Sequence, residues 1–308
     1  MLAIVAPGQG AQTPGFLTPW LTDGAVRNHV ADLTAAAGVD LIHAGTVADA
    51  DTIRDTAVAQ PLLVAAGLIA ASALVTDIGP ADVLAGHSVG EVTAAGIAGV
   101  LAPLDAIRLV RERALGMAEA AATTPTTMAA VVRGEPDQVL AAITAVGATA
   151  ANHNGAGQIV AAGTTAQISA LREKPPTGAR VIPLSVAGAF HTEHMQPGKE
   201  RLAALAVHLT PADPQSTLLS NADGAVVESG TGYLERLVGQ VTQPVRWDLC
   251  MTTMADLGVT GILELPPAGT LTGIAKRNLP GVELFNLNTP DQLDEARAFV
   301  ARHRAQEA

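Results

Sequence analysis

One pentapeptide, Gly86-His87-Ser88-Val89-Gly90, has the composition and order that place a serine for nucleophilic attack. The apolar segment 81–85 leads into it and a helical pattern follows, as in a nucleophile elbow, where a sharp turn lifts the serine hydroxyl above a sheet edge. At the start of that helix the backbone N–H of Val89 is placed to help bind a developing oxyanion. The alternative interpretation is an ordinary strand-to-helix turn in which the serine is the N-cap of the helix.

A serine nucleophile needs a base, and the chain has eight histidines, at positions 29, 43, 87, 153, 191, 194, 208 and 303. His87 adjoins the serine, but neighbouring side chains diverge on a sharp turn, which favours a packing or orienting role. His191 follows an apolar strand and a turn of small residues, and catalytic residues are often found on such loops. By its spacing alone, His191 is only slightly favoured over His194 as the candidate base.

The chain offers no obvious carboxylate for a triad of the α/β-hydrolase kind, in which serine, acid and histidine follow in that order. Glu135, Asp137 and Glu173 lie between Ser88 and His191 but fall outside the predicted main sheet. A carbonyl oxygen that accepts from the Nδ1–H of the histidine would fix the useful tautomer equally well.

The apolar segments around these residues predict an α/β fold with a mainly parallel sheet. Short apolar runs at 2–6, 81–85 and 261–265 predict strands buried on both faces. The segments 60–75 and 104–122 predict long helices. The run 62–75 is shorter than the roughly 20 residues of a membrane span, and its small residues suit a packed core helix. The N-terminus lacks the pattern of a signal peptide.

A change of pattern at 123–127 (TTPTT) predicts a hinge. The segments beyond it alternate between strand and helix, as in a ferredoxin-like fold: 128–133, a helix from Glu135-Pro136, 158–162, 164–172 and 181–186. We therefore predict a hydrolase-like α/β subdomain that carries the nucleophile elbow, formed by 1–126 and 188–308. Residues 127–187 are predicted to form a small ferredoxin-like α+β subdomain.

Composition excludes several classes of protein. The 308 residues include 18 Lys and Arg against 29 Asp and Glu, a net charge of −11 with no basic stripe, which argues against nucleic-acid binding. The single cysteine, Cys250, excludes an internal disulfide framework and a cysteine-based zinc site. We expect a soluble, cytoplasmic protein with no membrane contact and no metal.

Five separated motifs, in this order, point to a known family: Gly8-Gln9-Gly10-Ala11-Gln12, GHSVGE at 86–91, Arg113, Ala189-Phe190-His191, and Gln240 followed by PVRW at 244–247. Across essentially its whole length the sequence resembles the malonyl-CoA:acyl-carrier-protein transacylases, and it is similar to the acyltransferase domains of polyketide synthases. It departs from the family's late Gly-Pro-Gly turn at Pro266-Pro267-Ala268-Gly269, where fewer glycines make a stiffer loop.

The resemblance implies a role for each matching residue. Ser88 would become malonylated, and His191 would be its general base and later its general acid. The backbone amides of Gln9 and Val89 would form the oxyanion hole, and the main-chain carbonyl of Gln240 would orient His191. Further residues would bind the malonyl carboxylate or line the pocket: Arg113 for the carboxylate, and Gln60, His87, Asn152, Asn154 and Phe190 for the pocket.

The chemistry of malonate agrees with these roles. Malonyl carries a carboxylate that acetyl lacks, and a guanidinium can bind it in a bidentate manner. Only the family position favours Arg113 over Arg108 and Arg111. A phenylalanine at 190 accompanies malonyl selection in related domains, and its ring would fill the space of a 2-methyl branch; it could equally be a packing residue.

The resemblance implies an [acyl-carrier-protein] S-malonyltransferase of fatty-acid, and possibly polyketide, synthesis. Its substrates would be malonyl-CoA and the phosphopantetheine thiol of acyl carrier protein, with no tightly bound cofactor, and the protein would be a monomer. A serine esterase or thioesterase with the same elbow is the alternative, and a non-catalytic carrier-binding scaffold is a third. An arginine patch could attract the acidic carrier, with the candidates Arg172, Arg180, Arg201, Lys276 and Arg277.

Overall fold

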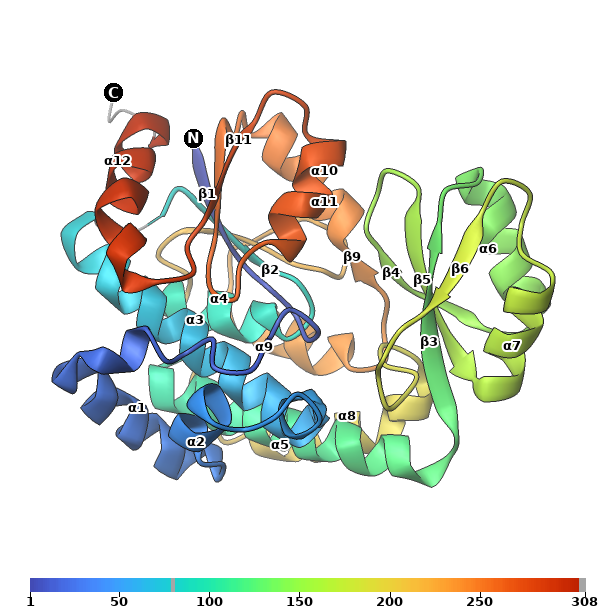
Figure 1. Cartoon of the computed structure of the whole chain (residues 1–308), viewed down its shortest axis with the longest axis horizontal. Coiled ribbons are helices and arrows are strands. Elements are labelled where there is room, and N and C mark those ends of the chain that lie inside the picture. The colour runs from blue at the N-terminus through green and yellow to red at the C-terminus, as the bar shows by residue number, and fades with distance from the viewer. Residues whose placement is uncertain (79–80, 305–308) are drawn as a thin grey trace.

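The computed structural model describes residues 1–78 and 81–304 and contains two β-sheets of different size (Figure 1). The larger sheet has the strand order β11-β10-β1-β2-β7-β8, and the smaller has the order β6-β3-β5-β4-β9. The strands are β1 (Leu2–Ala6), β2 (Val83–Gly86), β3 (Thr126–Val132), β4 (Thr149–His153), β5 (Gln158–Thr164), β6 (Arg180–Pro183), β7 (Thr217–Leu219), β8 (Val226–Val227), β9 (Val245–Arg246), β10 (Gly261–Glu264) and β11 (Glu283–Asn286).

Helices cover both sheets. They are α1 (Gly24–Ala37), α2 (Leu41–Thr46), α3 (Thr56–Ile78), α4 (Gly90–Ile97), α5 (Pro103–Thr123), α6 (Pro136–Ala145), α7 (Thr165–Glu173), α8 (Gln196–Ala206), α9 (Gly230–Gln240), α10 (Trp247–Asp256), α11 (Thr270–Asn278) and α12 (Leu293–His303).

The larger sheet is mainly parallel, as the sequence predicted. β1 lies in its interior and pairs in parallel with both β2 and β10; only the short edge strand β8 runs antiparallel. Alternate residues of β1 enter two different hydrophobic clusters. Leu2 and Ile4 pack with α3, α4 and α12, whereas Ala3 and Val5 pack with α10 and α11. A strand buried on both faces must be apolar throughout, which is why 2–6 is a continuous apolar run.

Helix α3 is, by length and composition, the one described helix apolar enough to cross a membrane. However, 78% of the most apolar stretch of this helix, within Thr56–Leu74, is buried inside the protein. It packs against α5, α4 and α12. Helix α3 is therefore a core helix, as predicted for the apolar run 62–75.

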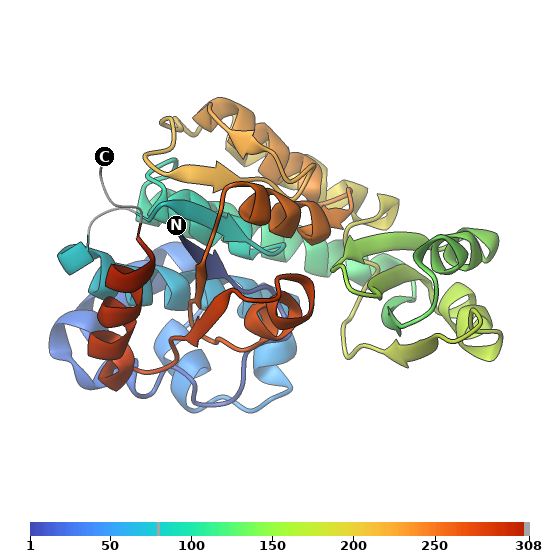
Figure 2. The ribbon, with the colours of Figure 1, turned by 90° about the horizontal axis from the view of Figure 1, so that it is seen from above.

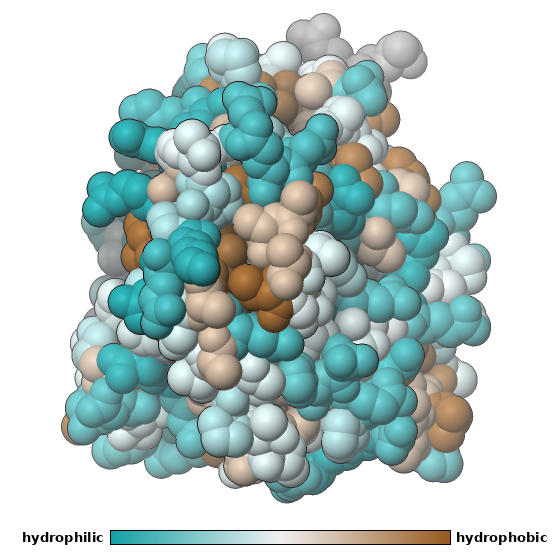
Figure 3. Space-filling model, turned by 90° about the vertical axis from the view of Figure 1, so that its right-hand side faces the viewer, coloured by the Kyte–Doolittle hydropathy of each residue, from teal (hydrophilic) through white to brown (hydrophobic). Residues whose placement is uncertain are grey.

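The smaller sheet, with α6 and α7 on one face, forms a lobe beside the larger one (Figures 1 and 2). Its order β6-β3-β5-β4 is antiparallel throughout, the ferredoxin-like arrangement. Seen end-on, the lobe has a mainly hydrophilic surface around a small hydrophobic patch (Figure 3).

The structure differs from the predicted small subdomain in three details. Strand β3 begins earlier than predicted, because Thr126 and Thr127 at the end of the predicted hinge already pair with β5. Strand β4 was missed because its sequence, TAANH, is poor in β-branched and aromatic residues. The lobe's sheet also takes β9 from the later part of the chain, in parallel with β4. The proposed division at 126/127 and 187/188 stays a prediction, and residues 305–308 of its last segment lie outside the described residues.

The nucleophile elbow depends on close backbone packing where β1, β2 and α4 meet. A Cβ on Gly86 would overlap the backbone of Gly90, and a Cβ on Gly90 would overlap the carbonyl group of Ala6. Only glycine allows this approach. Ser88, held between them, has a positive φ of 55°, a strained conformation for a residue with a side chain.

We predict that Gly90→Ala lowers the free energy of unfolding by about 3 kcal/mol, because the added methyl meets backbone that cannot move aside. Urea unfolding would measure this. The control is Gly273→Ala in α11, where a Cβ would meet nothing within 4 Å. Replacing that helical glycine should stabilise the protein by about 0.5–1 kcal/mol. Equal effects of the two changes would contradict the packing argument.

Candidate active site

The structure brings Ser88 and His191 together at the carboxyl end of β2. Ser88 Oγ lies 2.7 Å from His191 Nε2, and His191 Nδ1 lies 2.8 Å from the main-chain oxygen of Gln240 at the end of α9. His191 lies in the buried last part, 188–192, of the loop that follows β6 and, like Ser88, has a positive φ, here 61°. His194, the other candidate base, does not line the cavity around Ser88. A carbonyl group therefore occupies the place where a triad would have a carboxylate.

The surroundings of His191 keep its imidazole neutral. Burial, with a smaller contribution from the nearby Arg113 cation, lowers the pKa of His191 to about 3. With Nδ1–H donated to the Gln240 carbonyl, the lone pair on Nε2 faces the serine hydroxyl. This is the tautomer that a general base requires.

Arg113 projects from α5 into the interior and is 1% exposed. Its Nη1 donates to Gln60 Oε1 and its Nη2 to Gln240 Oε1, both at 2.6 Å, and Nη2 lies 3.4 Å from Ser88 Oγ. Burial lowers its pKa to about 10, against the favourable effect of Glu91, so the group is a cation at neutral pH. The direct hydrogen-bond partners of these two nitrogens are neutral amide oxygens, so the side of the guanidinium that faces Ser88 can still bind an anion.

Two residues without a predicted role hold the nucleophile. Asn221, just after β7, accepts from the backbone N–H of Ser88 at 2.8 Å and donates to the Gly86 carbonyl at 2.7 Å. Glu91, in the first turn of α4, is buried and accepts from the Gln240 side chain. The sequence signal that could have drawn attention to Glu91 is a charged residue at the start of an otherwise apolar helix. For Asn221 the only signal was its position after an apolar strand.

The amides of Gln9 and Val89 are free to act on a substrate. Within the part of the chain that the structure describes, neither backbone N–H makes a hydrogen bond, although both residues line the cavity at Ser88. The side chain of Gln9 is held by Thr56 Oγ1 at 3.2 Å. Since Asn221 occupies the N–H of Ser88, these two amides are the available donors for an oxyanion.

A cavity of about 440 Å³ between the two sheets contains the site. His87 lines this cavity: its Nε2 lies 3.0 Å from Asn154 Oδ1, and its ring packs edge-on against Trp247. Burial lowers the pKa of His87. The other residues predicted to line the pocket do line this cavity: Gln60, Phe190, Asn152 and Asn154. Gly269 lines it too, so the Pro266-Pro267-Ala268-Gly269 turn reaches the site.

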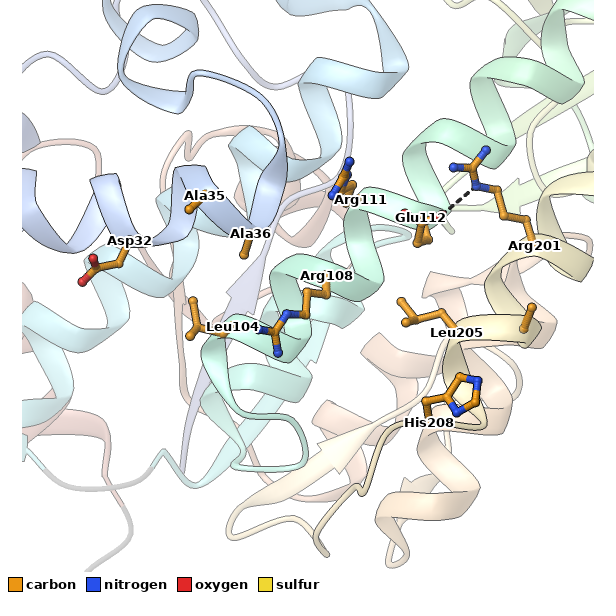
Figure 4. A pocket seen from close by; sticks show the side chains of 11 residues that line it. Asp32, Ala35, Ala36, Leu104, Arg108, Arg111, Glu112, Arg201, Leu205 and His208 are labelled. Carbon is orange, nitrogen blue, oxygen red and sulfur yellow. Dashed lines mark hydrogen bonds and ion pairs between the residues drawn. The ribbon is translucent and has the colours of Figure 1, made fainter.

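A second hollow, of about 830 Å³, lies on the outside of α1, α5 and α8 and contains no predicted catalytic residue (Figure 4). Arg108 and Arg111, the alternatives to Arg113, line it. So does Arg201, one of the five candidates for carrier docking, whose guanidinium binds Glu112 and Glu119 at 2.7 Å each. Of those five candidates only Arg277 lines the catalytic cavity, where it donates to Gln158.

We expect the imidazole of His191 to stay neutral between pH 8 and 5, because burial and Arg113 both oppose its protonation. Histidine side-chain NMR would show no titration of its ring signals over this range, with His191→Ala used to assign them. A titration near pH 6.5, the ordinary value for histidine, would show that the base is more open to solvent than this geometry allows.

The geometry agrees with comparisons to known proteins. The model of the acyl transferase domain family matches residues 4–293. The malonyl CoA-acyl carrier protein transacylase of Mycobacterium bovis is 49% identical over 298 residues, 96% of this chain and 99% of the relative. That of Escherichia coli K12 is 31% identical, over 96% of this chain and 98% of the relative.

Solved structures are similar over the same length. The crystal structure of MCAT from Mycobacterium tuberculosis has a TM-score of 0.94 and 49% identity and covers 96% of this chain and 99% of that chain. A type II PKS malonyl-transacylase, PlMCAT, in complex with its acyl-carrier protein AntF has a TM-score of 0.90 and 28% identity, with the same coverage.

Proposed function

The chain belongs to the acyl transferase family, and we propose that it transfers malonyl groups from malonyl-CoA to acyl carrier protein. The transfer passes through a malonyl ester of Ser88. The observation that carries the proposal is the buried Arg113 cation directly beside the Ser88–His191 pair. A hydrolase of neutral esters has no need for such a cation.

In the first half-reaction, His191 Nε2 takes the proton of Ser88 Oγ as that oxygen attacks the thioester carbonyl. The backbone N–H groups of Gln9 and Val89 donate to the resulting oxyanion. Collapse breaks the carbon–sulfur bond, and the departing CoA thiolate takes the proton from His191. The carbonyl oxygen of Gln240 holds the ring throughout.

The second half-reaction reverses these steps with a different thiol. The phosphopantetheine thiol of the carrier gives its proton to His191 and attacks the malonyl ester, and Ser88 recovers its proton as it leaves. The complex of PlMCAT with its acyl-carrier protein supports this kind of partner. We also propose that the protein is a cytoplasmic monomer without a tightly bound cofactor and that Lys276, Arg277, Arg172 and Arg180 contribute to carrier docking.

Arg113 would select the acyl group. Besides its bonds to Gln60 and Gln240, the guanidinium has a second N–H on Nη1 and the Nη2 N–H that otherwise donates to Ser88 Oγ at 3.4 Å, and these two would bind the malonyl carboxylate. Acetyl leaves that buried charge unpaired, at a cost of about 3–5 kcal/mol. Phe190, in the cavity wall, would restrict the space for a 2-methyl branch.

Incubation with malonyl-CoA alone should give a protein whose intact mass is increased by one malonyl group, and Ser88→Ala should abolish the adduct. CoA release without a persistent adduct would indicate the serine esterase or thioesterase instead. No reaction would favour a carrier-binding scaffold.

Arg113→Ala should lower the preference for malonyl-CoA over acetyl-CoA about 10²–10⁴-fold, since about 1.4 kcal/mol corresponds to each factor of ten. The measurement is kcat/KM for acylation by each thioester. Arg108→Ala is the matched control, because Arg108 lies on the same helix but lines the outer hollow. An unchanged preference in Arg113→Ala would exclude Arg113 as the selecting residue.

A further inference from the structure

Glu91 is a buried carboxylate for which the proposed function gives no role. It is 1% exposed, and each of its oxygens has a partner. Oε1 accepts from the backbone N–H of Asn221 at 2.7 Å and from the hydroxyl of Tyr233 at 3.4 Å. Oε2 accepts from the side-chain Nε2 of Gln240. Burying a carboxylate costs free energy of folding unless such hydrogen bonds compensate it, which suggests that Glu91 has a specific role.

The contact with Gln240 determines which way that side-chain amide points. Gln240 Nε2 donates to Glu91 and, at 3.0 Å, to the Ser88 carbonyl, which leaves Oε1 facing Arg113 Nη2 at 2.6 Å. A flipped amide would place its NH₂ against the guanidinium and its oxygen against the carboxylate. Both contacts would then be repulsive, so an ionised Glu91 allows one orientation only.

We propose that Glu91 is a positioning residue that acts through the side-chain amide of Gln240 to hold Arg113 where it binds the acyl carboxylate. This rests on the proposed function. The same Gln240 residue holds His191 through its main-chain carbonyl, which does not depend on the amide orientation. Loss of Glu91 should therefore reduce selection for malonyl more than it reduces acyl transfer itself.

The electrostatics give the proposal a pH dependence. Burial raises the pKa of Glu91 to about 7 against the opposing effects of its hydrogen bonds and Arg113. The protonated form is a poorer acceptor for Gln240, so malonyl preference should fall as the pH drops through about 7 and recover above it.

The pKa values of the other ionisable groups around Glu91 are displaced away from pH 7. The pKa of Arg113 is lowered only to about 10, and that of His191 is lowered to about 3. Burial raises the pKa of the Tyr233 hydroxyl and of the Cys250 thiol and lowers that of His87. A change in preference near pH 7 is therefore assigned to Glu91.

The experiment measures kcat/KM for acylation by malonyl-CoA and by acetyl-CoA from pH 5.5 to 8.5 in the full-length protein. Glu91→Gln should lower the malonyl-to-acetyl ratio about 10- to 100-fold above pH 7, the size expected for a lost hydrogen bond to a charged group, and should flatten its pH dependence. Glu91→Asp should retain the pH dependence with a smaller ratio. Glu112→Gln, which removes a carboxylate on the outer side of α5, is the control and should match the unmodified protein.

The outcomes separate the two proposals. If malonyl-CoA does not acylate the unmodified protein, the proposed function fails. If it does, but Glu91→Gln slows both thioesters equally and leaves the ratio and its pH dependence intact, Glu91 is a structural residue and the inference is wrong. Should Glu91→Gln fail to fold, the unmodified protein decides: a ratio that stays flat from pH 5.5 to 8.5 overturns the inference.

Discussion

Burial of the Arg113 guanidinium beside the Ser88 hydroxyl sets the requirements that the other groups of the site meet. A cation in the interior needs partners, and Gln60 and Gln240 supply neutral oxygens from α3 and α9. The charge is held in place by these oxygens but not cancelled by them. It also contributes to the low pKa of His191, so the same cation attracts a carboxylate and keeps the base neutral.

Gln240 connects the two requirements of this chemistry. Its main chain orients the base, and its side chain holds the arginine, so general-base catalysis and selection of the acyl group meet at the end of α9. Asn221 supports the same region by binding both Ser88 and Gly86, which fixes the strained elbow. The result is a rigid constellation drawn from segments as far apart in the chain as Ser88 and Gln240, which are separated by 152 positions.

Sequence patterns predicted the parts of this constellation that are local. The elbow could be found because its glycines, its strand and its helix are adjacent in sequence, and β1 because a strand buried on both faces must be apolar. The resemblance to a family was needed to choose Arg113 over Arg108 and Arg111, since burial of a helical arginine is not visible in the residues themselves.

Other features could not be predicted because they depend on contacts across the fold. Strand β4 was missed because pairing with β5 and β9 stabilises residues of low strand propensity. Glu91 and Asn221 were missed because their importance arises from their contacts with Gln240 and Ser88, which are distant in the sequence.

A crystal structure of the malonyl-enzyme, trapped by rapid cooling of crystals soaked with malonyl-CoA, would show directly whether Arg113 binds the acyl carboxylate. We predict that the free carboxylate of the malonyl-Ser88 ester lies within hydrogen-bond distance of Arg113 Nη1 and Nη2, with its carbonyl oxygen near the amides of Gln9 and Val89. A malonyl group whose carboxylate points away from Arg113, towards solvent or α11, would contradict this role for the buried cation.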